Sequence, residues 1–580
     1  MNAPSSQTQV ISIAIMGSGG AGAITTGSLL LEAAGQAGWY GLLTRSVGPQ
    51  IRGGEALAMV RLALTPVTGH GDRYDVLVAL DWHNANRFIA EVPLDNKSLI
   101  FADTEGGDPP AAILATGARV ISLPFTDLAD DLPNARPNLL ALGMLSELLG
   151  IPMDAMVQAV IRTLSGKGLS AAHATDALAA GSQLRSAFPT DTQRLAPPQP
   201  RDASTHWLVT GNQAAALGAL HGGIRFAAVY PITPATDLSE WMAPRLQKLG
   251  GHLIQAEDEI ASMNMVLGAS FGGIPSMTIT SGPGLALMTE TLGLAVAAEI
   301  PAVVVNVMRG GPSTGIPTKS EQSDLNIALY GLHGDAPHLV LASQSVTDCL
   351  ITTQWAVQLS EALQCPAIVL SDQFMGQALT ICERPTPLSD APPRRIAEVG
   401  MGRYDRYALT EDGISPMAIP GTLGGQYTAD GLEHNAHGTP SSSVADHLVQ
   451  LDKRRIKLEQ YDYGDAWAEI DGEGETAVLT WGSTTAAVLE AVAQARAAGL
   501  AVKVIALRLL SPTRPEHMAL ALQGVRRALV VEQSHSAQFH HFLRAYYSLP
   551  DRVEVISRPG PLPIRPSEVL NHLLQEIDHE

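Results

Sequence analysis

Three consecutive carboxylates precede an apolar segment near the middle of the chain. They are Glu257, Asp258 and Glu259, in the stretch LIQAEDEIASMNMVLGASFGG (residues 253–273). Residues 260–271 are small or apolar, without lysine or arginine, which predicts a buried helix. Acidic residues in a first helical turn ordinarily interact with the helix dipole. Because a buried helix leaves only one or two of the three in solvent, we expect another carboxylate at the mouth of an apolar pocket.

Polar loops follow three strand-like segments in the same part of the chain. They are VYPITPATD (229–237), TITSGPG (278–284) and MRGGPSTGIPTKSEQSD (308–324). Since open α/β sheets bind ligands at the carboxyl ends of their strands, we expect the three loops to meet at one edge. Together with Glu259, they predict a binding site rather than three unrelated turns.

The residue types in these loops indicate what such a site receives. Pro231 and Pro234 stiffen the first loop and hold the hydroxyl of Thr233 in one place. The second loop has two glycines around a proline, so its backbone can approach a ligand closely. In the third, glycines and hydroxyl residues follow Arg309, a set typical of a carboxylate or phosphate receiver. The hydroxyl residues of this third loop are Ser313, Thr314 and Thr318.

A glycine-rich turn, GSGGAG, lies close to the N-terminus. Gly17, Gly19 and Gly22 satisfy G-x-G-x-x-G after a strand and before a helix, where backbone N–H groups can face a phosphate. A nicotinamide site also needs an acidic residue at the end of the next strand. That region carries Arg45 and Arg52 instead, which disfavours NAD and suits the extra phosphate of NADP or coenzyme A. A purely structural glycine turn remains an alternative.

The pattern of strands, helices and linkers divides the chain into three α/β blocks. A first domain is predicted over residues 1–185, followed by a proline-rich linker over 186–205. A second domain is expected over 206–400, and a poorly patterned extended segment over 401–469. Three strands separated by helices predict an open parallel sheet over 470–580.

Composition excludes several classes of function. The net charge is −20 and no basic cluster occurs, so nucleic acid is not an expected partner. The apolar runs are too short to span a bilayer and the N-terminus has no signal-peptide pattern, so we expect a cytoplasmic protein. Cys349, Cys365 and Cys382 are far apart and form no CxxC pair. They predict buried, inert thiols rather than ligands of an iron–sulfur cluster.

Several of these motifs together are similar to one enzyme family. GNQAAALGAL, YPITPAT, the Glu259 segment, TSGPGLALMTETLGLA and RGGPSTGIPTKSEQSDL resemble the α subunit of thiamine-diphosphate-dependent 2-oxoacid:ferredoxin oxidoreductases. The variant with a γ domain fused in front, most often a 2-oxoglutarate:ferredoxin oxidoreductase, is the one that the chain resembles. The resemblance implies three α/β domains: an N-terminal γ domain, a pyrimidine-binding domain and a transketolase C-terminal-like domain.

The resemblance also implies roles for individual residues. Glu259, nine residues before Gly268, would be the glutamate that interacts with N1′ of the cofactor's aminopyrimidine and so favours removal of the proton from thiazolium C2. The 2-oxoacid would bind Thr233, Arg309 and Thr318. The cofactor would contact Pro231, Ile232, Ser281, Gly282 and Gly284. Substrate or coenzyme A contacts in the γ domain would come from Arg45, Arg52, Gly17, Gly19 and Gly22. Glu532 and Gln538 match an E-x5-Q pattern of the third domain, and no metal ligands are predicted, the pair His540–His541 included.

The sequence also lacks motifs that a complete thiamine enzyme needs. No G-D-G…N segment is present for Mg²⁺ and the diphosphate. By resemblance, a β subunit would supply the diphosphate and Mg²⁺ site and a [4Fe–4S] cluster, in an (αβ)₂ assembly. The expected reaction converts 2-oxoglutarate, coenzyme A and oxidised ferredoxin to succinyl-CoA, CO₂ and reduced ferredoxin, reversibly. One alternative is the same chemistry on pyruvate or another 2-oxoacid. Another is a nucleotide-binding regulatory subunit, which titration with NADP and coenzyme A would distinguish.

Overall fold

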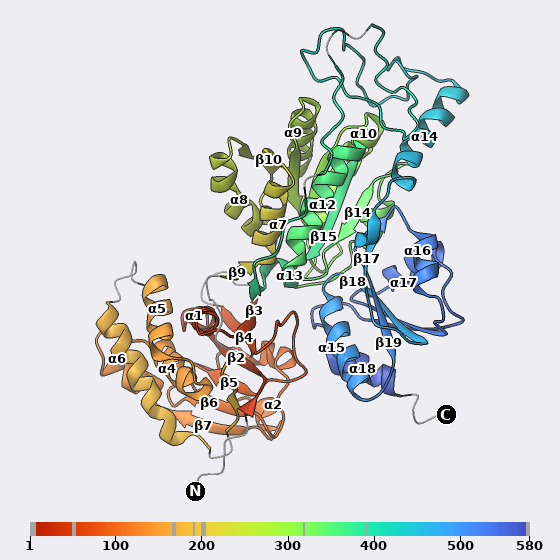
Figure 1. Cartoon of the computed structure of the whole chain (residues 1–580). Helices are drawn as coiled ribbons and strands as arrows, with labels where there is room; N and C mark the ends of the chain where they lie inside the picture. The colour runs from red at the N-terminus through yellow and green to blue at the C-terminus, as the bar shows by residue number, and fades with distance from the viewer. Residues whose placement is uncertain are drawn as a thin grey trace. The chain divides into compact units, whose positions relative to one another are not determined.

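The structure is a computed structural model in which two compact units can be distinguished. It describes residues 7–48, 54–164, 170–189, 192–198, 205–316, 319–389, 391–398, 400 and 402–575. The first unit consists of residues 1–210 and 377–385, and the second of residues 211–376 and 386–580 (Figure 1).

The first unit is built on a mixed eight-stranded sheet in the order β7-β6-β5-β2-β4-β3-β16-β9. Strands β2, β5, β6 and β7 are parallel, whereas β4, β3, β16 and β9 continue the sheet in antiparallel pairs. The strands are β2 (Val10–Ser18), β3 (Tyr40–Val47), β4 (Glu55–Ala63), β5 (Val76–Ala79), β6 (Leu99–Asp103), β7 (Arg119–Leu123), β9 (His206–Thr210) and β16 (Leu379–Glu383). The helices are α1 (Ala23–Gln36), α2 (Ala111–Leu114), α3 (Phe125–Asp130), α4 (Pro137–Leu149), α5 (Met153–Leu164) and α6 (Ala171–Ser182). A short separate pair joins β1 (Gln7–Thr8) to β8 (Arg194–Leu195).

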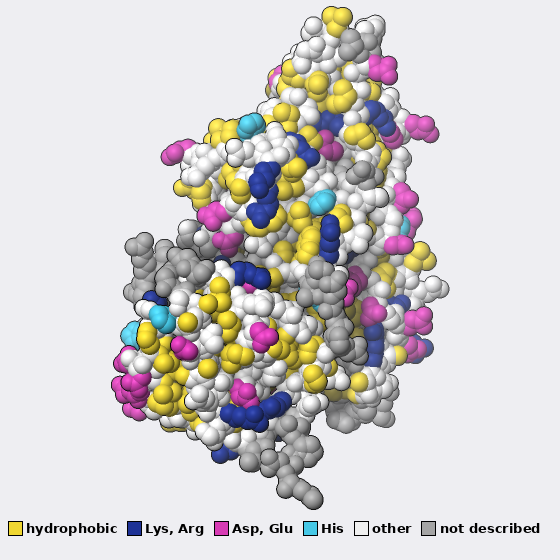
Figure 2. Space-filling view, turned by 60° about the vertical axis from the view of Figure 1, so that its left-hand side comes forward, with side chains coloured by type: hydrophobic (Ala, Val, Ile, Leu, Met, Phe, Trp, Pro, Cys, Tyr) yellow, Lys and Arg dark blue, Asp and Glu magenta, His cyan; other side chains and the backbone are white. Residues whose placement is uncertain are grey.

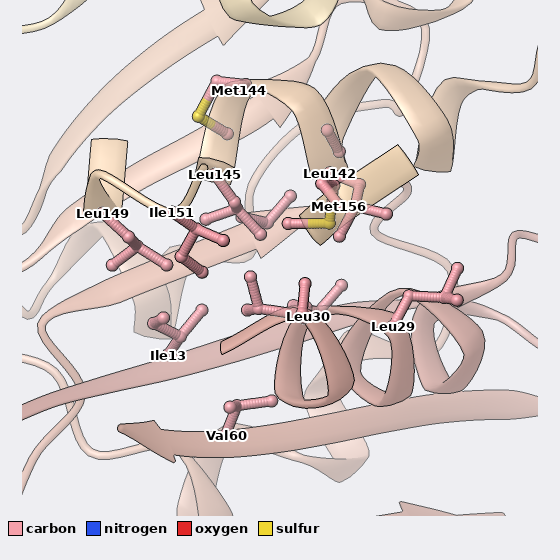
Figure 3. Packing of buried hydrophobic residues seen from close by; sticks show 14 of the residues in the cluster. Ile13, Leu29, Leu30, Val60, Leu142, Met144, Leu145, Leu149, Ile151 and Met156 are labelled. Carbon is pink, nitrogen blue, oxygen red and sulfur yellow. The ribbon is translucent and has the colours of Figure 1, made fainter. Parts of the chain in front are cut away.

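The main core of the first unit lies between its sheet and the helices α1, α4 and α5. Figure 3 shows Leu29 and Leu30 of α1 between Leu145 of α4 and Val60 of β4. Helices α4 and α6 approach each other through glycines, since a Cβ at Gly143 would lie 2.1 Å from the carbonyl oxygen of Leu178. This core therefore buries one face of the sheet.

Two segments join the first sheet although the sequence places them in the second block. Strand β16 pairs with β3 and β9, and Tyr40 Oη donates to Glu383 Oε1 at 2.8 Å. The first unit therefore includes residues 206–210 and 377–385, which the sequence predicts to lie in the second domain, 206–400. A short strand-forming pattern cannot reveal which sheet the strand joins, because that depends on partners more than 150 residues away.

The second unit contains a seven-stranded sheet in the order β11-β10-β12-β13-β15-β14-β20. All neighbours are parallel except β20, which pairs antiparallel with β14. The strands are β10 (Phe226–Val229), β11 (His252–Gln255), β12 (Ser276–Thr280), β13 (Ala302–Met308), β14 (Leu339–Ala342), β15 (Pro366–Asp372) and β20 (Leu509–Ser511). The helices are α7 (Gly211–His221), α8 (Thr236–Lys248), α9 (Glu259–Phe271), α10 (Gly282–Ala297), α11 (Leu325–Tyr330), α12 (Asp348–Leu363) and α13 (Gln373–Gln377).

A five-stranded sheet in the order β17-β19-β18-β21-β22 completes the second unit. It is parallel except for β17, as the sequence predicts for this block. Its strands are β17 (Ala468–Asp471), β18 (Thr476–Trp481), β19 (Val502–Leu507), β21 (Arg527–Glu532) and β22 (Arg552–Ser557). Its helices are α15 (Thr484–Ala497), α16 (Pro515–Ala521), α17 (Gln538–Tyr546) and α18 (Pro566–Leu574).

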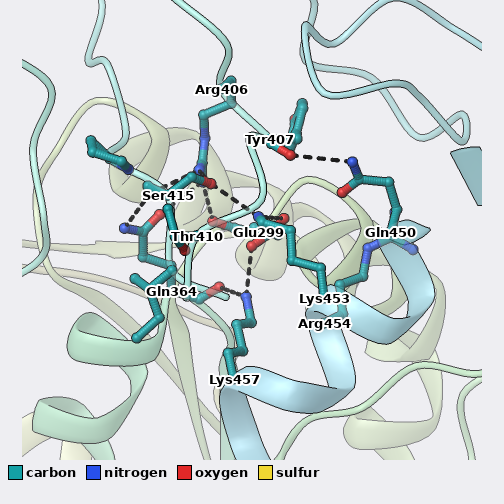
Figure 4. Close-up of polar contacts among 12 residues, drawn as sticks. Glu299, Gln364, Arg406, Tyr407, Thr410, Ser415, Gln450, Lys453, Arg454 and Lys457 are labelled. Atoms are coloured by element: carbon teal, nitrogen blue, oxygen red, sulfur yellow. Dashed lines mark hydrogen bonds and ion pairs between the residues drawn. The ribbon is translucent and has the colours of Figure 1, made fainter. Parts of the chain in front are cut away.

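The segment before the last sheet contains a helix whose polar face is buried. Helix α14 (Val444–Glu459) buries Lys453 and Lys457, whereas Val444 and Leu448 are exposed. Figure 4 shows both lysines beside Glu299, with Nζ···Oε distances of 2.5 and 2.9 Å. The predicted extended segment is thus anchored by buried charges, a pattern that inverts ordinary amphipathicity.

The three cysteines and the surface of the described residues bear on the predictions from composition. Cys349, Cys365 and Cys382 are buried, as predicted, and burial raises the pKa of the first two thiols to about 12. Among the helices that the structure describes, none combines the length and apolar character needed to cross a bilayer. Figure 2 shows lysine and arginine side chains in small separate groups on the face in view.

Candidate active site

Glu259 is the one buried member of the three consecutive carboxylates. Asp258 is the N-cap of α9 and its Oδ1 accepts the backbone N–H of Ala261 at 2.7 Å. Glu257 is exposed, whereas Glu259, the first residue of α9, is only 6% exposed. The expectation that capping and solvent account for two of the carboxylates is therefore confirmed. The third needs another explanation.

The loop between β12 and α10 lies directly against Glu259. A Cβ at Gly284 would come within 2.7 Å of Glu259 Oε1 and 2.1 Å of Thr280 Oγ1, so the position has no room for a side chain. Ser281 is at the N-cap position of α10, yet its hydroxyl does not cap the helix. Within the described residues, the buried Oγ of Ser281 has no hydrogen-bond partner. A carboxylate, a bare glycine backbone and an unused hydroxyl thus lie together.

The first and third predicted loops also meet. Arg309 Nη1 donates to the backbone oxygen of Thr233 at 2.7 Å, so the loops after β10 and β13 are in contact. The buried Nε of Arg309 finds no acceptor among the described residues. Burial lowers the pKa of the half-buried Arg309. An arginine with one donor used and another unsatisfied can receive an external carboxylate.

The strand order explains why these loops converge. Strands β11, β10, β12 and β13 are consecutive neighbours in the parallel sheet, and their carboxyl ends lead into residues 256–258, 230–235, 281–284 and 309–324. Glu259 follows the first of these ends and Arg309 the last. The ends of parallel strands share one edge, so four loops can surround a ligand there.

Asp324 is a buried carboxylate in this region that our sequence analysis did not single out. Asn306 Nδ2 donates to Asp324 Oδ2 at 2.9 Å, and a Cβ at Gly282 would lie 2.6 Å from Asp324 Oδ1. Glu259 and Asp324 therefore contact alternate glycines in the first turn of α10. Burial raises the pKa of Asp324 to about 6, and the neighbouring negative charge of Glu321 acts in the same direction.

Loops of the five-stranded sheet form hydrogen bonds with the segment that follows Arg309. Gln322 Nε2 donates to Trp481 O at 2.7 Å, and Gln322 Oε1 accepts the N–H of Gln533. Gln538 spans the same interface through bonds to Ser323 O and the N–H of Asn326. The two residues of the matched E-x5-Q pattern therefore have different roles. Gln538 bonds the segment after Arg309, whereas the buried Glu532 accepts backbone N–H groups at the start of α17.

The donor set fits the aminopyrimidine half of thiamine diphosphate. A flat heteroaromatic ring with ring nitrogens needs a carboxylate and further polar groups in its plane. Glu259 supplies the carboxylate, beside Gly284. Buried atoms without partners in the described part of the chain can supply the polar contacts; they are Oγ1 of Thr278, Oγ of Ser281, Oδ1 of Asn306 and Oγ of Ser323. This is more unsatisfied polarity than a packed core tolerates.

Comparisons with known proteins agree with this geometry. Residues 217–453 match the family of pyruvate flavodoxin/ferredoxin oxidoreductase, thiamine diphosphate-binding, and residues 12–184 match pyruvate ferredoxin/flavodoxin oxidoreductase. The chain is 33% identical over 513 residues to 2-oxoacid:ferredoxin oxidoreductase 2, subunit alpha, of Aeropyrum pernix, covering 80% of this chain and 79% of that one. This chain belongs to the 2-oxoacid:ferredoxin oxidoreductase family.

Two further relatives carry a more specific name. 2-Oxoglutarate oxidoreductase subunit KorA of Mycobacterium tuberculosis is 31% identical over 531 residues, covering 84% of this chain and 79% of that one. A solved structure, 2-oxoglutarate:ferredoxin oxidoreductase from Magnetococcus marinus with 2-oxoglutarate, coenzyme A and succinyl-CoA bound, matches with a TM-score of 0.91 and 36% identity. That match covers 98% of this chain and 100% of the other. The predicted three-domain α/β fold of this oxidoreductase family is confirmed.

The remaining predicted residues of this oxidoreductase lie in different places. Pro231 and Thr233 are exposed, and Ile232 is half-buried. Thr318 and Arg52 lie outside the described residues. Ser313 and Thr314 are exposed in the loop after Arg309. In the first unit, Arg45 is an exposed residue of β3.

The glycine turn of the first unit has a structural explanation. The N–H of Ser18, which a bound phosphate would need, donates to Asp81 Oδ2 at 2.8 Å. Gly22 has a φ of 89° and packs against Asn138, so a side chain there would be strained and blocked. Strand β3, which follows α1, is not a parallel neighbour of β2, as a dinucleotide-binding βαβ unit requires. Gly19 lies in the turn between β2 and α1. The geometry therefore favours the structural alternative over a phosphate site.

Proposed function

We propose that this chain is the α subunit of a thiamine-diphosphate-dependent enzyme that acts on 2-oxoglutarate. The reaction consumes 2-oxoglutarate, coenzyme A and two oxidised ferredoxins, and yields succinyl-CoA, CO₂, one proton and two reduced ferredoxins. The observation that carries the proposal is the buried carboxylate of Glu259 against Gly284, next to unsatisfied hydroxyls and an arginine with a free donor. The names of the KorA relatives and of the Magnetococcus marinus enzyme support the substrate.

The residues of this chain divide the work as follows. When bound, thiamine diphosphate supplies an acidic carbon that adds to the 2-oxoacid ketone and lets the carboxylate leave as CO₂. Glu259 holds or shares a proton at N1′ of the aminopyrimidine. Arg309 binds the substrate carboxylate, and Thr233 presents its hydroxyl beside it. Ser281, Gly282 and Gly284 line the aminopyrimidine.

A β subunit supplies the parts that this chain lacks. We assign to it the diphosphate and Mg²⁺ site and the [4Fe–4S] cluster that passes electrons to ferredoxin, in an (αβ)₂ enzyme of the cytoplasm. The helices beside Glu259 support a covering partner, because α9 and α10 contain no lysine or arginine and still expose Ile260, Met265 and Leu287. Helices that are apolar on every face are normally buried.

Metal analysis of the isolated chain tests this division of labour. We expect the purified chain to contain no stoichiometric iron and to show no 2-oxoglutarate-dependent reduction of viologen. Both should appear when the chain is co-expressed with the product of an adjacent reading frame that has GDG and cysteine motifs. Stoichiometric iron in the chain alone would contradict the proposal, and tight binding of NADP without thiamine binding would favour a regulatory subunit.

Arg309→Ala tests substrate recognition. Because Arg309 binds the carboxylate common to all 2-oxoacids, kcat/KM should fall for 2-oxoglutarate and pyruvate alike. Losing a charge-assisted hydrogen bond costs about 1.5–3 kcal/mol, or roughly 10–100-fold. By contrast, Arg45→Ala should lower kcat/KM for 2-oxoglutarate by this factor and leave pyruvate nearly unchanged, if Arg45 meets the distal carboxylate. The same comparison applies to Arg52→Ala.

The two arginine variants can also give the opposite pattern. Weaker saturation by coenzyme A in Arg45→Ala would assign that residue to the coenzyme A site. An Arg309→Ala enzyme with normal kinetics on both substrates would remove Arg309 from substrate binding. Steady-state viologen reduction at varied 2-oxoacid and coenzyme A concentrations separates these outcomes.

A further inference from the structure

Asp324 occupies a helix-cap position without acting as a cap. It precedes α11, but its side chain accepts no hydrogen bond from the first turn of that helix. An aspartate at this position ordinarily stabilises its helix by accepting a hydrogen bond from a backbone N–H of the first turn. Its carboxylate instead accepts from Asn306 Nδ2 and lies against Gly282. The side chain is therefore directed toward the candidate site.

Charged groups reach Asp324 from the elements packed around it. Arg309 and Glu321 belong to the same loop, and Asn306 on β13 is its neutral hydrogen-bond donor. Glu259 lies against Gly284, and Asp324 lies against Gly282, in the first turn of α10. Asp324 is only 9% exposed, and burial is the largest cause of its raised pKa, which is about 6. The positive charge of Arg309 opposes this shift and favours the ionised form.

Arg309 couples Asp324 to the substrate. The two side chains attract each other, and the charge of Asp324 opposes the lowering of the Arg309 pKa by burial. Their hydrogen bonds go elsewhere: Arg309 Nη1 donates to Thr233 O, and Asp324 accepts from Asn306. A carboxylate that binds the unused donors of Arg309 would neutralise the charge that keeps Asp324 ionised.

We propose that Asp324 is a positioning residue that takes up one proton from solvent when a 2-oxoacid carboxylate binds Arg309. The inference rests on the proposed function of this site. The substrate carboxylate brings one negative charge, and the proton taken up by Asp324 cancels it. The net charge of Arg309, Asp324 and Glu321 together with this one substrate carboxylate is then the same as before binding. Proton uptake thus removes the repulsion that a second buried carboxylate would exert on the substrate.

The sign of the pH dependence follows from this uptake. Binding that takes up a proton becomes weaker as the pH rises from the pKa of free Asp324, about 6, toward its higher pKa in the complex. The affinity changes by about tenfold for each unit by which the substrate raises that pKa. We expect the dissociation constant for 2-oxoglutarate to rise about three- to tenfold between about pH 6 and 8, with kcat little affected by Asp324.

Calorimetry of the αβ complex tests the proposal directly. Titrating 2-oxoglutarate at pH 7 in buffers of different ionisation enthalpy counts the protons taken up. A Glu259→Gln background with thiamine diphosphate bound, titrated without coenzyme A and ferredoxin, keeps turnover negligible during the measurement. The complex should take up a fraction of a proton per site. Asp324→Asn is nearly isosteric and keeps an acceptor for Asn306, so it should abolish uptake and bind more tightly than the parent at pH 8. Glu516→Gln, an exposed change on α16, is the matched control.

The outcomes separate the proposal from its premise. Equal proton uptake in Asp324→Asn and its parent, or no uptake in the parent, would overturn the role of Asp324. Should the Asp324→Asn complex fail to assemble, the parent measurement still decides. Weaker binding of Asp324→Asn at every pH would also count against the proposal, because it indicates a merely structural role. If 2-oxoglutarate does not bind the parent at all, the proposed function itself is wrong.

Discussion

Glu259→Gln is expected to lower turnover of 2-oxoglutarate by a factor of about 10²–10⁴, the usual contribution of a positioned acid–base group. Glutamine has nearly the same shape, so the contact with Gly284 should persist. It cannot exchange a proton with N1′ of the aminopyrimidine. The substrate site should be unaffected, because Arg309 and Thr233 lie in other loops. Steady-state viologen reduction with the co-expressed αβ complex measures the effect.

The neighbouring carboxylate provides a matched control. Glu257→Gln removes the same charge two residues away, at an exposed position, and should leave turnover within a few-fold of wild type. Unchanged circular dichroism and thiamine content of the Glu259→Gln complex would show that its fold and cofactor are retained. Activity of Glu259→Gln close to that of wild type would remove Glu259 from the proposed mechanism.

Sequence reasoning located this site because its signals are local. The loops at 229–237, 278–284 and 308–324 each follow a strand, and parallel strands place such loops at one edge. The structure confirms that the outer two loops touch, through Arg309 and the backbone of Thr233. The burial of Glu259 also follows from its position before an apolar helix. These inferences need only the order of elements along the chain.

Asp324 could not be recognised in the same way. An aspartate before a short helix is the ordinary signature of an N-cap, and that interpretation fits the sequence. Only the tertiary contacts with Asn306 and Gly282 show that the side chain turns away. Its partners lie 18 and 42 positions earlier, on separate elements. No local pattern encodes such a contact.

Helix α14 illustrates a second limit. Its apolar residues would normally define the buried face, but Val444, Leu448 and Val449 are exposed. The face that packs against the unit carries Lys453 and Lys457 instead. Hydrophobic periodicity therefore predicts the wrong orientation, because the buried partner of this helix is a carboxylate about 150 residues away.

The carboxylate in question, Glu299, should be the most sensitive single position for the stability of the second unit. It is 1% exposed, and it accepts from both Lys453 and Lys457. Arg406 is also fully buried and donates to the backbone oxygen of Glu299 and to Gln364 Oε1 (Figure 4). The positive charges of these three residues hold the pKa of Glu299 far below its ordinary value despite complete burial. One carboxylate thus compensates three buried cations.

Glu299→Gln is expected to destabilise this region by about 3–5 kcal/mol, the cost of removing one partner from a buried ion pair. Amide hydrogen exchange of residues 402–459 should be faster by about 10²–10⁴-fold where opening of this region limits exchange. Glu290→Gln, an exposed change on α10, the helix that precedes Glu299, should leave exchange unaltered. A double variant, Glu299→Gln with Lys453→Met, should lose less than the sum of the two single variants.

The pH dependence separates this electrostatic effect from a packing defect. In the wild type the contribution of Glu299 is present above its ordinary pKa of 4.5 and is lost as the pH falls through its lower folded-state pKa. Lys453 differs, because burial lowers its pKa to about 8 even beside Glu299. Without the carboxylate its pKa should fall further, so the folded Glu299→Gln variant releases a proton that the unfolded chain keeps. The stability deficit of the variant relative to the wild type should therefore shrink as the pH rises toward about 8, measured as protection factors corrected for the intrinsic exchange rate, whereas a packing defect would leave that deficit constant.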